Sequence, residues 1–255
     1  MLQIILCFFT VTLSLFAQPP YIIREPLETP RALSATVIIP CAAQHFLHLA
    51  PLLDFYSQQT RSPDEIVVSL SEIERIDTAA IDALENKSWP FRLNILRHTG
   101  KRSAGMNRNL ACKASKGDLI ICQDADDIPH PQRVEIVRFL FENYPIIHLM
   151  HTYFYEKPDW EFAPYCKEDI NPYFFHNFDQ LSSVYQDHLH NGNISFLREV
   201  SQNLHWEDVF GFDHDVKFNR DAYRLFKEGA AIDRDLILYR QRLSAFNPAN
   251  IPWER

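Results

Sequence analysis

The sequence predicts an α/β domain with a doubly wound sheet, and two observations support this fold class. Short apolar runs rich in β-branched residues alternate with segments of helical periodicity from residue 35 to about residue 145. Such runs are typical of parallel strands buried on both faces, and the alternation is typical of βαβ units. The chain has 255 residues, of which 46% are hydrophobic, which fits one domain with a packed core.

The chain begins with an apolar segment that resembles a signal peptide. Within residues 1–18, the apolar run from Leu2 to Phe16 is short for a membrane-spanning helix, and Ala17 offers a cleavage point. The first residues carry no Lys or Arg, so an uncleaved anchor or a buried N-terminal helix stays open. We expect export or membrane anchoring through this segment rather than a cytoplasmic location. Residues 19–34 are proline-rich and aperiodic, which predicts a linker.

Four strands and three helices are expected in the first half of the domain. Apolar runs predict strands at Thr36–Ile39, Glu65–Val68, Leu93–Leu96 and Leu119–Cys122. Helical spacing of apolar residues predicts helices over Phe46–Tyr56, from about Ser103 to Lys116, and over Val134–Phe141. Pro40 is expected to end the first strand, while Ser103 should cap the second helix and Gly117 should stop it.

The second half of the domain gives weaker signals. Its segments are aromatic and histidine-rich, and we expect only a strand over Asn193–Leu197 and a helix over Asp213–Lys227. The eleven histidines form no coherent set of metal ligands along the chain, so most are interpreted as structural. His190, which stands beside Asn191 and Gly192, is interpreted as a sugar contact.

Composition and cysteine usage exclude two classes of function. The formal net charge of -8 argues against nucleic acid as a partner, because binding to phosphates needs clustered Lys and Arg. The five cysteines show no CxxC pair and no Cys/His spacing typical of a zinc site. Cys41 and Cys122 adjoin predicted strands and are interpreted as small buried hydrophobes, with a disulfide as the open alternative.

A cluster of carboxylates follows the fourth predicted strand. Asp124, Asp126 and Asp127 stand at its carboxyl end, where open α/β sheets bind ligands. Three carboxylates within four positions repel one another, and hard oxygen donors suit magnesium or manganese. The pattern therefore indicates a divalent-metal site in which the metal would hold a diphosphate. A solvated turn in which Asp127 caps the next helix is the alternative that needs no metal.

Three stretches of the chain resemble family 2 glycosyltransferases. Residues 117–133, GDLIICQDADDIPHPQR, resemble the donor-site signature of that family. Residues 104–118, AGMNRNLACKASKGD, resemble its helix with glycine, Arg-Asn and alanines, and residues 34–68 resemble its first βαβ unit. The resemblance implies a GT-A fold with a mixed, doubly wound sheet, a nucleotide-sugar donor and a divalent metal, manganese or magnesium. It also implies one glycosyltransferase domain with a donor-binding half and an acceptor-binding half, at residues 35–255, 35–145 and 146–255.

The resemblance also implies roles for individual residues around the carboxylates. Asp126 is the expected metal ligand, Asp124 would contact the metal or the ribose, and Asp127 would share the coordination. Arg108, in the Arg-Asn sequence, and Lys101, just before that helix, would approach the diphosphate of the donor. Surface solvation is the alternative for Lys101.

Residues 205–223, HWEDVFGFDHDVKFNRDAY, resemble the acceptor-side segment of the family, in which an Asp opens a helix. Asp213 matches that Asp and would remove a proton from the acceptor hydroxyl as it attacks the anomeric carbon, which inverts the configuration. Alternatively, Asp213 only starts a helix and pairs with Lys217. A second acidic pair, Glu207 and Asp208, lies upstream.

Together these features predict a metal-dependent, inverting glycosyltransferase with a glycan, lipid or protein hydroxyl as acceptor. Two alternatives stay open. Phe212 replaces the usual Glu of the family, Ser69 stands where an acidic residue is common, and Arg242 stands where a His is frequent. The departures at Phe212 and Ser69 favour a degenerate module that binds a nucleotide or glycan without chemistry. A nucleotidyltransferase would also use carboxylates and magnesium, but the chain lacks an early Gly- and Lys-rich triphosphate loop.

Overall fold

The computed structural model describes residues 19–157, 160–186, 189–209 and 213–240, and of residues 213–215 it describes the backbone alone. The predicted signal peptide or anchor, residues 1–18, lies outside the described residues. Within the described ranges, every helix is too short or too polar to cross a bilayer.

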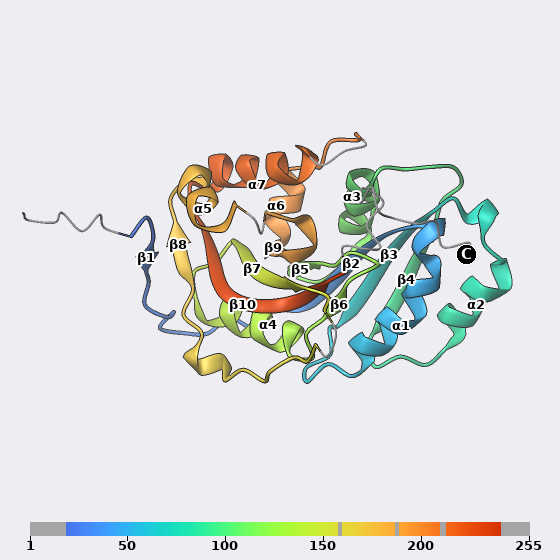
Figure 1. Ribbon diagram of the computed structural model, residues 1–255, viewed down its shortest axis with the longest axis horizontal. Helices are drawn as coiled ribbons and strands as arrows, with labels where there is room; N and C mark the ends of the chain where they lie inside the picture. The colour runs from blue at the N-terminus through green and yellow to red at the C-terminus, as the bar shows by residue number, and fades with distance from the viewer. Residues whose placement is uncertain (1–18, 158–159, 187–188, 210–212, 241–255) are drawn as a thin grey trace, which may run out of the picture.

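One ten-stranded sheet runs through the whole domain (Figure 1). Its strand order is β1-β8-β10-β7-β9-β5-β2-β3-β4, and β6 pairs with β10 beside this path. The strands are β1 (Ile22–Ile23), β2 (Ala35–Ala42), β3 (Glu65–Ser71), β4 (Arg92–Arg97), β5 (Leu119–Cys122), β6 (Ile128–Pro129), β7 (His148–Tyr155), β8 (Tyr173–Phe175), β9 (Ile194–Leu197) and β10 (Gly229–Tyr239).

The sheet is mixed, as predicted, and four neighbouring strands form a parallel block. The strands β5, β2, β3 and β4 are parallel to one another. The strand β9 lies antiparallel between β5 and β7, and beyond it β7 and β10 are again parallel. The carboxyl end of β5 therefore lies where the parallel part of the sheet meets its antiparallel part.

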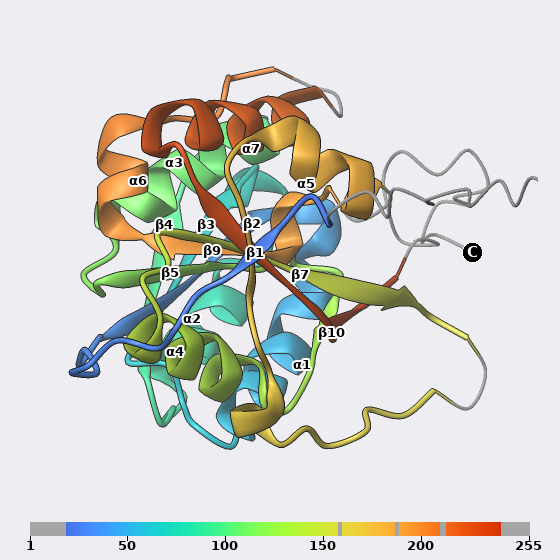
Figure 2. The same cartoon turned by 90° about the vertical axis from the view of Figure 1, so that its left-hand side faces the viewer.

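Helices cover both faces of the sheet, which confirms the doubly wound arrangement (Figures 1 and 2). One face carries α1 (Phe46–Ser57), α2 (Thr78–Asn86) and α4 (Arg133–Asn143). The opposite face carries α3 (Ala104–Ala114), α5 (Phe178–Tyr185), α6 (Arg198–Asn203) and α7 (Asp213–Phe226).

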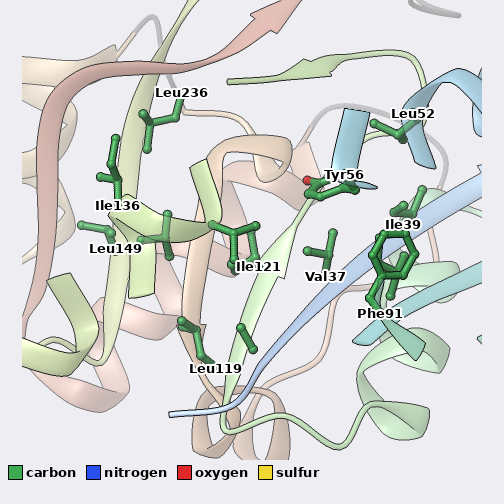
Figure 3. Close-up of a cluster of buried hydrophobic side chains, with 14 of the residues drawn as sticks. Val37, Ile39, Leu52, Tyr56, Phe91, Leu119, Ile121, Ile136, Leu149 and Leu236 are labelled. Carbon is green, nitrogen blue, oxygen red and sulfur yellow. The ribbon is translucent and has the colours of Figure 1, made fainter. Parts of the chain in front are cut away.

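The core has two layers because the central strands are buried on both sides. Val37 and Ile39 of β2 face the layer under α1 and α4, where Tyr56 and Ile121 also lie (Figure 3). Ile38, between them in the sequence, packs into the other layer. This alternation explains why the strands read as continuous apolar runs, since neither face of the sheet meets water.

The predicted cap of α3 agrees with the structure, whereas the predicted ends at Gly117 and Pro40 are wrong, because α3 already ends at Ala114. Ser103 caps α3, because its Oγ accepts a hydrogen bond from the amide of Met106 at 3.0 Å. The expectation that Pro40 ends its strand is wrong, because β2 continues to Ala42. Pairing of β2 with β5 stops at Ile38, so Pro40 has only β3 beside it and its missing amide proton costs little.

Residues 19–34, which the sequence predicts to be a linker, are hydrogen-bonded to the domain. The strand β1 pairs with β8 at the edge of the sheet. Farther on, the amide of Leu27 donates to the carbonyl of Asn143 at 2.6 Å, and the guanidinium of Arg31 donates to the carbonyl of Tyr144 at 2.7 Å. This segment therefore runs along the end of α4.

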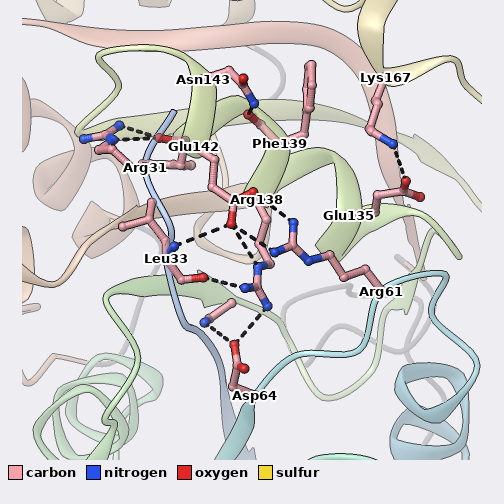
Figure 4. Close-up of polar contacts among 12 residues, drawn as sticks. Arg31, Leu33, Arg61, Asp64, Glu135, Arg138, Phe139, Glu142, Asn143 and Lys167 are labelled. Carbon is pink, nitrogen blue, oxygen red and sulfur yellow. Dashed lines mark hydrogen bonds and ion pairs between the residues drawn. The ribbon is translucent and has the colours of Figure 1, made fainter. Parts of the chain in front are cut away.

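A set of ion pairs, here called the α4 network, joins α4 to the amino ends of the parallel strands (Figure 4). Glu142 accepts hydrogen bonds from both terminal nitrogens of Arg61, at 2.9 and 3.0 Å. The guanidinium of Arg138 donates to Asp64 at 2.9 Å, and Asp64 in turn accepts from the amide that opens β2. Arg138 Nε also lies 3.7 Å from Glu142, and Lys167 pairs with Glu135 at 2.7 Å.

Candidate functional site

Asp124, Asp126 and Asp127 form an acidic turn directly after β5. The amide of Gln123 donates to the carbonyl of Ile38 at 3.0 Å, which fixes the start of the turn to the neighbouring strand. The turn thus lies at the carboxyl end of the central strand, where the sheet changes from parallel to antiparallel pairing. Open α/β sheets bind ligands at such ends.

Asp124 is held by Arg108 and approached by His190. The Nη2 of Arg108, a residue of α3, donates to Asp124 Oδ1 at 2.6 Å, and His190 Nε2 lies 3.6 Å from Asp124 Oδ2. Burial alone would raise the pKa of Asp124, but the charges of Arg108 and His190 and the hydrogen bond from Arg108 outweigh it, so the pKa is lowered. Asp124 is therefore a carboxylate, with one oxygen turned toward His190.

The loop that carries His190 is fitted closely to Asp124. His190 Nδ1 accepts a hydrogen bond from the amide of Gly192 at 3.1 Å, which leaves Nε2 on the side of the carboxylate. A Cβ on Gly192 would come within 3.1 Å of Asp124 Oδ2. Only glycine leaves this oxygen uncrowded.

Asp127 is the most buried carboxylate of the turn. Its side chain is 3% exposed, and its Oδ1 accepts from the amide of Arg240 at 2.9 Å. Its Oδ2 is buried with no hydrogen-bond partner among the described residues. Burial, together with the charges of Asp126 and Asp124, raises the pKa of Asp127 well above its usual range. A cation at Oδ2 would relieve this cost, because buried carboxylate oxygens normally have a partner.

Asp126 points toward a different partner from its two neighbours. Its Oδ2 lies 3.7 Å from Nδ1 of His45, just after β2. Burial raises the pKa of Asp126, and the charge of Asp124 adds to this, while His45 lowers it. His45 is not among the site residues predicted from the sequence, although its place after the first predicted strand, at the same end of the sheet, was a usable signal.

Asp124, Asp127 and His190 bring three donor atoms together. One ligand atom from each side chain lies within 4.8 Å of the others. Two carboxylates and one imidazole fit a divalent cation of intermediate hardness such as manganese, and the orphaned Oδ2 of Asp127 is one of the oxygens available to it. Asp126 is outside this group, so its role as a metal ligand stays a prediction. His190, predicted as a sugar contact, lies with the donors instead.

Arg133, at the start of α4, supports the acidic turn from behind. Its guanidinium is fully buried and donates to the carbonyl of Cys122, the side-chain oxygen of Gln123 and the carbonyl of Gly192. It also donates to the hydroxyl of Tyr56 at 3.2 Å. Arg133 therefore ties the end of β5 to the loop that carries His190. Its acceptors are carbonyls and neutral side chains, so only a basic residue after a proline could be recognised from the sequence.

The remaining predicted site residues differ in how well the structure places them. Lys101 is exposed in the loop before α3, and its role at the diphosphate stays a prediction. Asp213 is the first residue of α7, but its side chain lies outside the described residues, as do Phe212 and Arg242. Ser69 is buried and donates to Asn107, which gives it a structural contact.

The upstream acidic pair is engaged elsewhere. Asp208 accepts a hydrogen bond from the cap residue Ser103 at 2.7 Å, and Glu207 lies 3.4 Å from the ammonium of Lys217. Lys217 also pairs with Asp221 at 2.7 Å. These contacts give both upstream carboxylates structural partners.

Comparisons with known proteins agree on the family and the fold. The model of glycosyl transferase family 2 matches residues 36–204. An uncharacterized glycosyltransferase of Haemophilus influenzae is 27% identical over 101 residues, which cover 39% of this chain and 32% of that protein. This chain therefore spans about a third of that curated relative.

Two solved structures show the same architecture. The S. aureus protein TarS in complex with UDP-GlcNAc aligns with a TM-score of 0.62 and 14% identity, over 81% of this chain and 58% of the TarS chain. The mannosyltransferase PcManGT of Pyrobaculum calidifontis, in complex with GDP-Man and Mn2+, aligns with a TM-score of 0.54 and 17% identity, over 86% and 59%. At these identities the likeness is one of fold, and it confirms the GT-A arrangement predicted from the sequence. Because the family model matches more than half of the chain and includes the acidic turn, this protein belongs to glycosyl transferase family 2.

Proposed function

We propose that this chain is a metal-dependent, inverting glycosyltransferase that moves a sugar from a nucleoside-diphosphate donor to a hydroxyl acceptor. The observation that carries the proposal is the convergence of Asp124, Asp127 and His190 at the carboxyl end of β5. Family membership supplies the type of reaction, and the converging donor atoms supply a reason for the buried charge of the turn.

Asp124, Asp127 and His190 would hold the metal. When bound, a manganese or magnesium ion would bind the donor diphosphate and neutralise the charge on the leaving group. The complex of PcManGT with GDP-Man and Mn2+ is consistent with this chemistry in a protein of the same fold. Among the chain's own residues, Arg108 keeps Asp124 ionised and fixes its orientation toward His190.

Inversion requires one base on the acceptor side of the anomeric carbon. Asp213 is the proposed base, because it opens α7 while Asp208 and Glu207 are bonded to Ser103 and Lys217. Its role would be to accept the proton of the attacking hydroxyl, so that bond formation and departure of the diphosphate occur on opposite faces of the sugar.

The test is a donor screen. The full chain is incubated with a panel of nucleotide sugars and manganese, and release of the nucleoside diphosphate is measured. Asp126→Ala and Asp124→Ala should each abolish release while the thermal unfolding midpoint shows a folded protein. Unchanged turnover in both variants would reject the assigned site. Metal-dependent nucleotide binding without product from any acceptor would instead favour the degenerate binding module, and pyrophosphate release from a nucleoside triphosphate would favour a nucleotidyltransferase.

We further propose that residues 1–18 export the protein or anchor it to a membrane. The support is the apolar run that ends before the proline pair. Fractionation of cells that express the full chain or a chain beginning at Pro19 tests this. Equal recovery of both chains in the cytoplasmic fraction would contradict it.

A further inference from the structure

We infer that an aromatic patch beside the acidic turn binds a sugar ring of the acceptor, which makes the acceptor a glycan. The patch consists of Tyr153 and Tyr155 of β7, Tyr239 of β10, and His190. The inference rests on the proposed function, because it names the second substrate of the same site. It selects among the glycan, lipid and protein hydroxyls that the sequence leaves open.

The patch is built by the pairing of two parallel strands. Tyr153 and Tyr155 are two residues apart, so they share one face of β7, and Tyr239 is the register partner of Tyr155 in β10. The ring centroids lie 5.6 Å apart for Tyr153 and Tyr155, 5.2 Å for Tyr153 and Tyr239, and 5.6 Å for Tyr155 and Tyr239. These tilted and edge-on contacts hold the three rings in fixed positions.

The patch consists of one buried ring that supports an exposed one. Tyr153 is 8% exposed, whereas Tyr155 is 49% exposed. A large aromatic side chain held in place and open to solvent beside a polar site is typical of a binding surface rather than of a core. The buried Tyr153 supports the exposed ring, so a ligand would meet a surface that needs little ordering.

The patch is continuous with the acidic turn. The ring of His190 lies 5.1 Å from that of Tyr239 and 6.0 Å from that of Tyr153, and its Nε2 lies 3.6 Å from Asp124 Oδ2. The residue after Tyr239, Arg240, donates its amide to Asp127 at 2.9 Å. A ligand seated on the rings would therefore reach the reacting centre without a further pocket.

The position in the sheet favours the acceptor over the donor. The parallel strands β2, β3 and β4 lie on one side of β5, and their carboxyl ends form the expected nucleotide side. The strands β7 and β10 lie on the other side, beyond β9. The aromatic patch thus faces the acidic turn from the side opposite the expected nucleotide.

The chemistry of the patch suits a sugar. The C–H face of a pyranose ring packs on an aromatic ring, while its hydroxyl groups need hydrogen-bond partners nearby. Here tyrosine rings supply the apolar face and their hydroxyls supply polar tips, with the carboxylates of the acidic turn close by. A lipid chain would need a deeper apolar surface without polar rims.

Saturation-transfer NMR tests the inference without requiring turnover. The full chain, with manganese and either UDP or GDP, is titrated with tetrasaccharides of glucose, N-acetylglucosamine, galactose and mannose. At least one should bind, and Tyr155→Ala should weaken its affinity about tenfold, as expected when an aromatic contact worth about 1.4 kcal/mol is lost. Tyr155→Phe keeps the ring and should change the affinity by less than about twofold.

A matched control is Phe55→Ala. Phe55 is 37% exposed near the end of α1 that is remote from His45, so its loss should leave sugar binding unchanged. Equal affinity in Tyr155→Ala and the parent protein would overturn the inference. Binding of none of the tetrasaccharides would also overturn it. So would contact of Tyr155 with the alkyl chain of dodecyl maltoside micelles and not with their sugar. Sugar binding that depends on Tyr155 in a protein that binds no nucleotide would leave the patch intact and reject the proposed transferase.

Discussion

The α4 network and the acidic turn lie at opposite ends of the same parallel strands, and their carboxylates are paired in opposite ways. In the network, Glu142 binds both terminal nitrogens of Arg61, and Asp64 binds Arg138 as well as a backbone amide (Figure 4). In the acidic turn, three neighbouring carboxylates share one directly bonded guanidinium among the described residues, that of Arg108.

The difference shows which charged groups stabilise the fold and which do not. Carboxylates of the network meet cations, so their charge stabilises the fold modestly. In the acidic turn, burial and mutual repulsion raise the pKa of Asp127, so the ionised form of Asp127 destabilises the folded protein. Groups whose pKa is strongly shifted by burial and neighbouring charges occur at functional sites more often than groups in balanced ion pairs.

The largest expected effect is the loss of activity in Asp127→Asn. Asparagine keeps an oxygen for the amide of Arg240 but removes the charge, so kcat should fall about 10²–10³-fold while the free energy of unfolding does not decrease. Steady-state release of nucleoside diphosphate and urea unfolding measure the two quantities. A loss of stability parallel to the loss of activity would show that the acidic turn is structural, like the network.

Arg133→Met should have the largest effect on stability. The change removes the buried donor to the carbonyls of Cys122 and Gly192 and leaves Gln123 Oε1 with Tyr56 as its donor, so the free energy of unfolding should fall by about 3 kcal/mol. Urea unfolding at neutral pH measures this. Arg75→Met, at an exposed position, is the control and should change little. A similarly small loss of stability in Arg133→Met and Arg75→Met would mean that the guanidinium of Arg133 does not stabilise the fold.

Glu142→Gln should lower the stability and leave the activity unchanged, which is the reverse of the effect expected for Asp127→Asn. It removes the charge that Arg61 and Arg138 share, so the free energy of unfolding should fall by about 1 kcal/mol, and kcat should not change. Asp54→Asn breaks an exposed pair with Lys87 and should cost less. A fall in kcat for Glu142→Gln would break the separation between the two regions.

The smallest expected effect is the pH dependence of Lys167→Ala. Hydrogen bonds from Lys167 and then Thr60 lower the pKa of Glu135 below its usual 4.5 in the folded protein. Glu135 therefore stabilises the fold above pH 4.5, and this is lost as the pH falls through the folded-state pKa. At pH 7 the variant should be slightly less stable than the parent protein, and the difference should shrink as the pH falls below 4.5. A difference that persists in acid would point to lost packing of the Lys167 stem instead.

The first half of the fold was predictable because its strands are apolar on both faces. Thr36–Ile39 and Leu119–Cys122 stand out as apolar runs, and both are strands. The strand β7 was missed because it contains His148 and His151, which are buried but look polar in a sequence. The strand β10 was missed because Asp233 and Arg234 interrupt its apolar run at a register shift.

The candidate site was predictable where its residues are neighbours in sequence. Asp124 and Asp127 follow one strand, so local pattern finds them. His190, His45 and Arg133 come from three other segments, and only the strand order brings them to the same place. The aromatic patch is of this second kind, since Tyr155 and Tyr239 meet through the pairing of β7 with β10.

The last described strand lies inside the sheet rather than at its edge, which has a consequence for biosynthesis. β10 separates β7 from β8, and it ends beside Arg240, whose amide reaches Asp127. While the ribosome is still making residues 229–240, β7 has an open edge and Asp127 lacks its backbone donor. A nascent chain that stalls before this point would lack that donor and would expose the edge of β7 to wrong strand pairing.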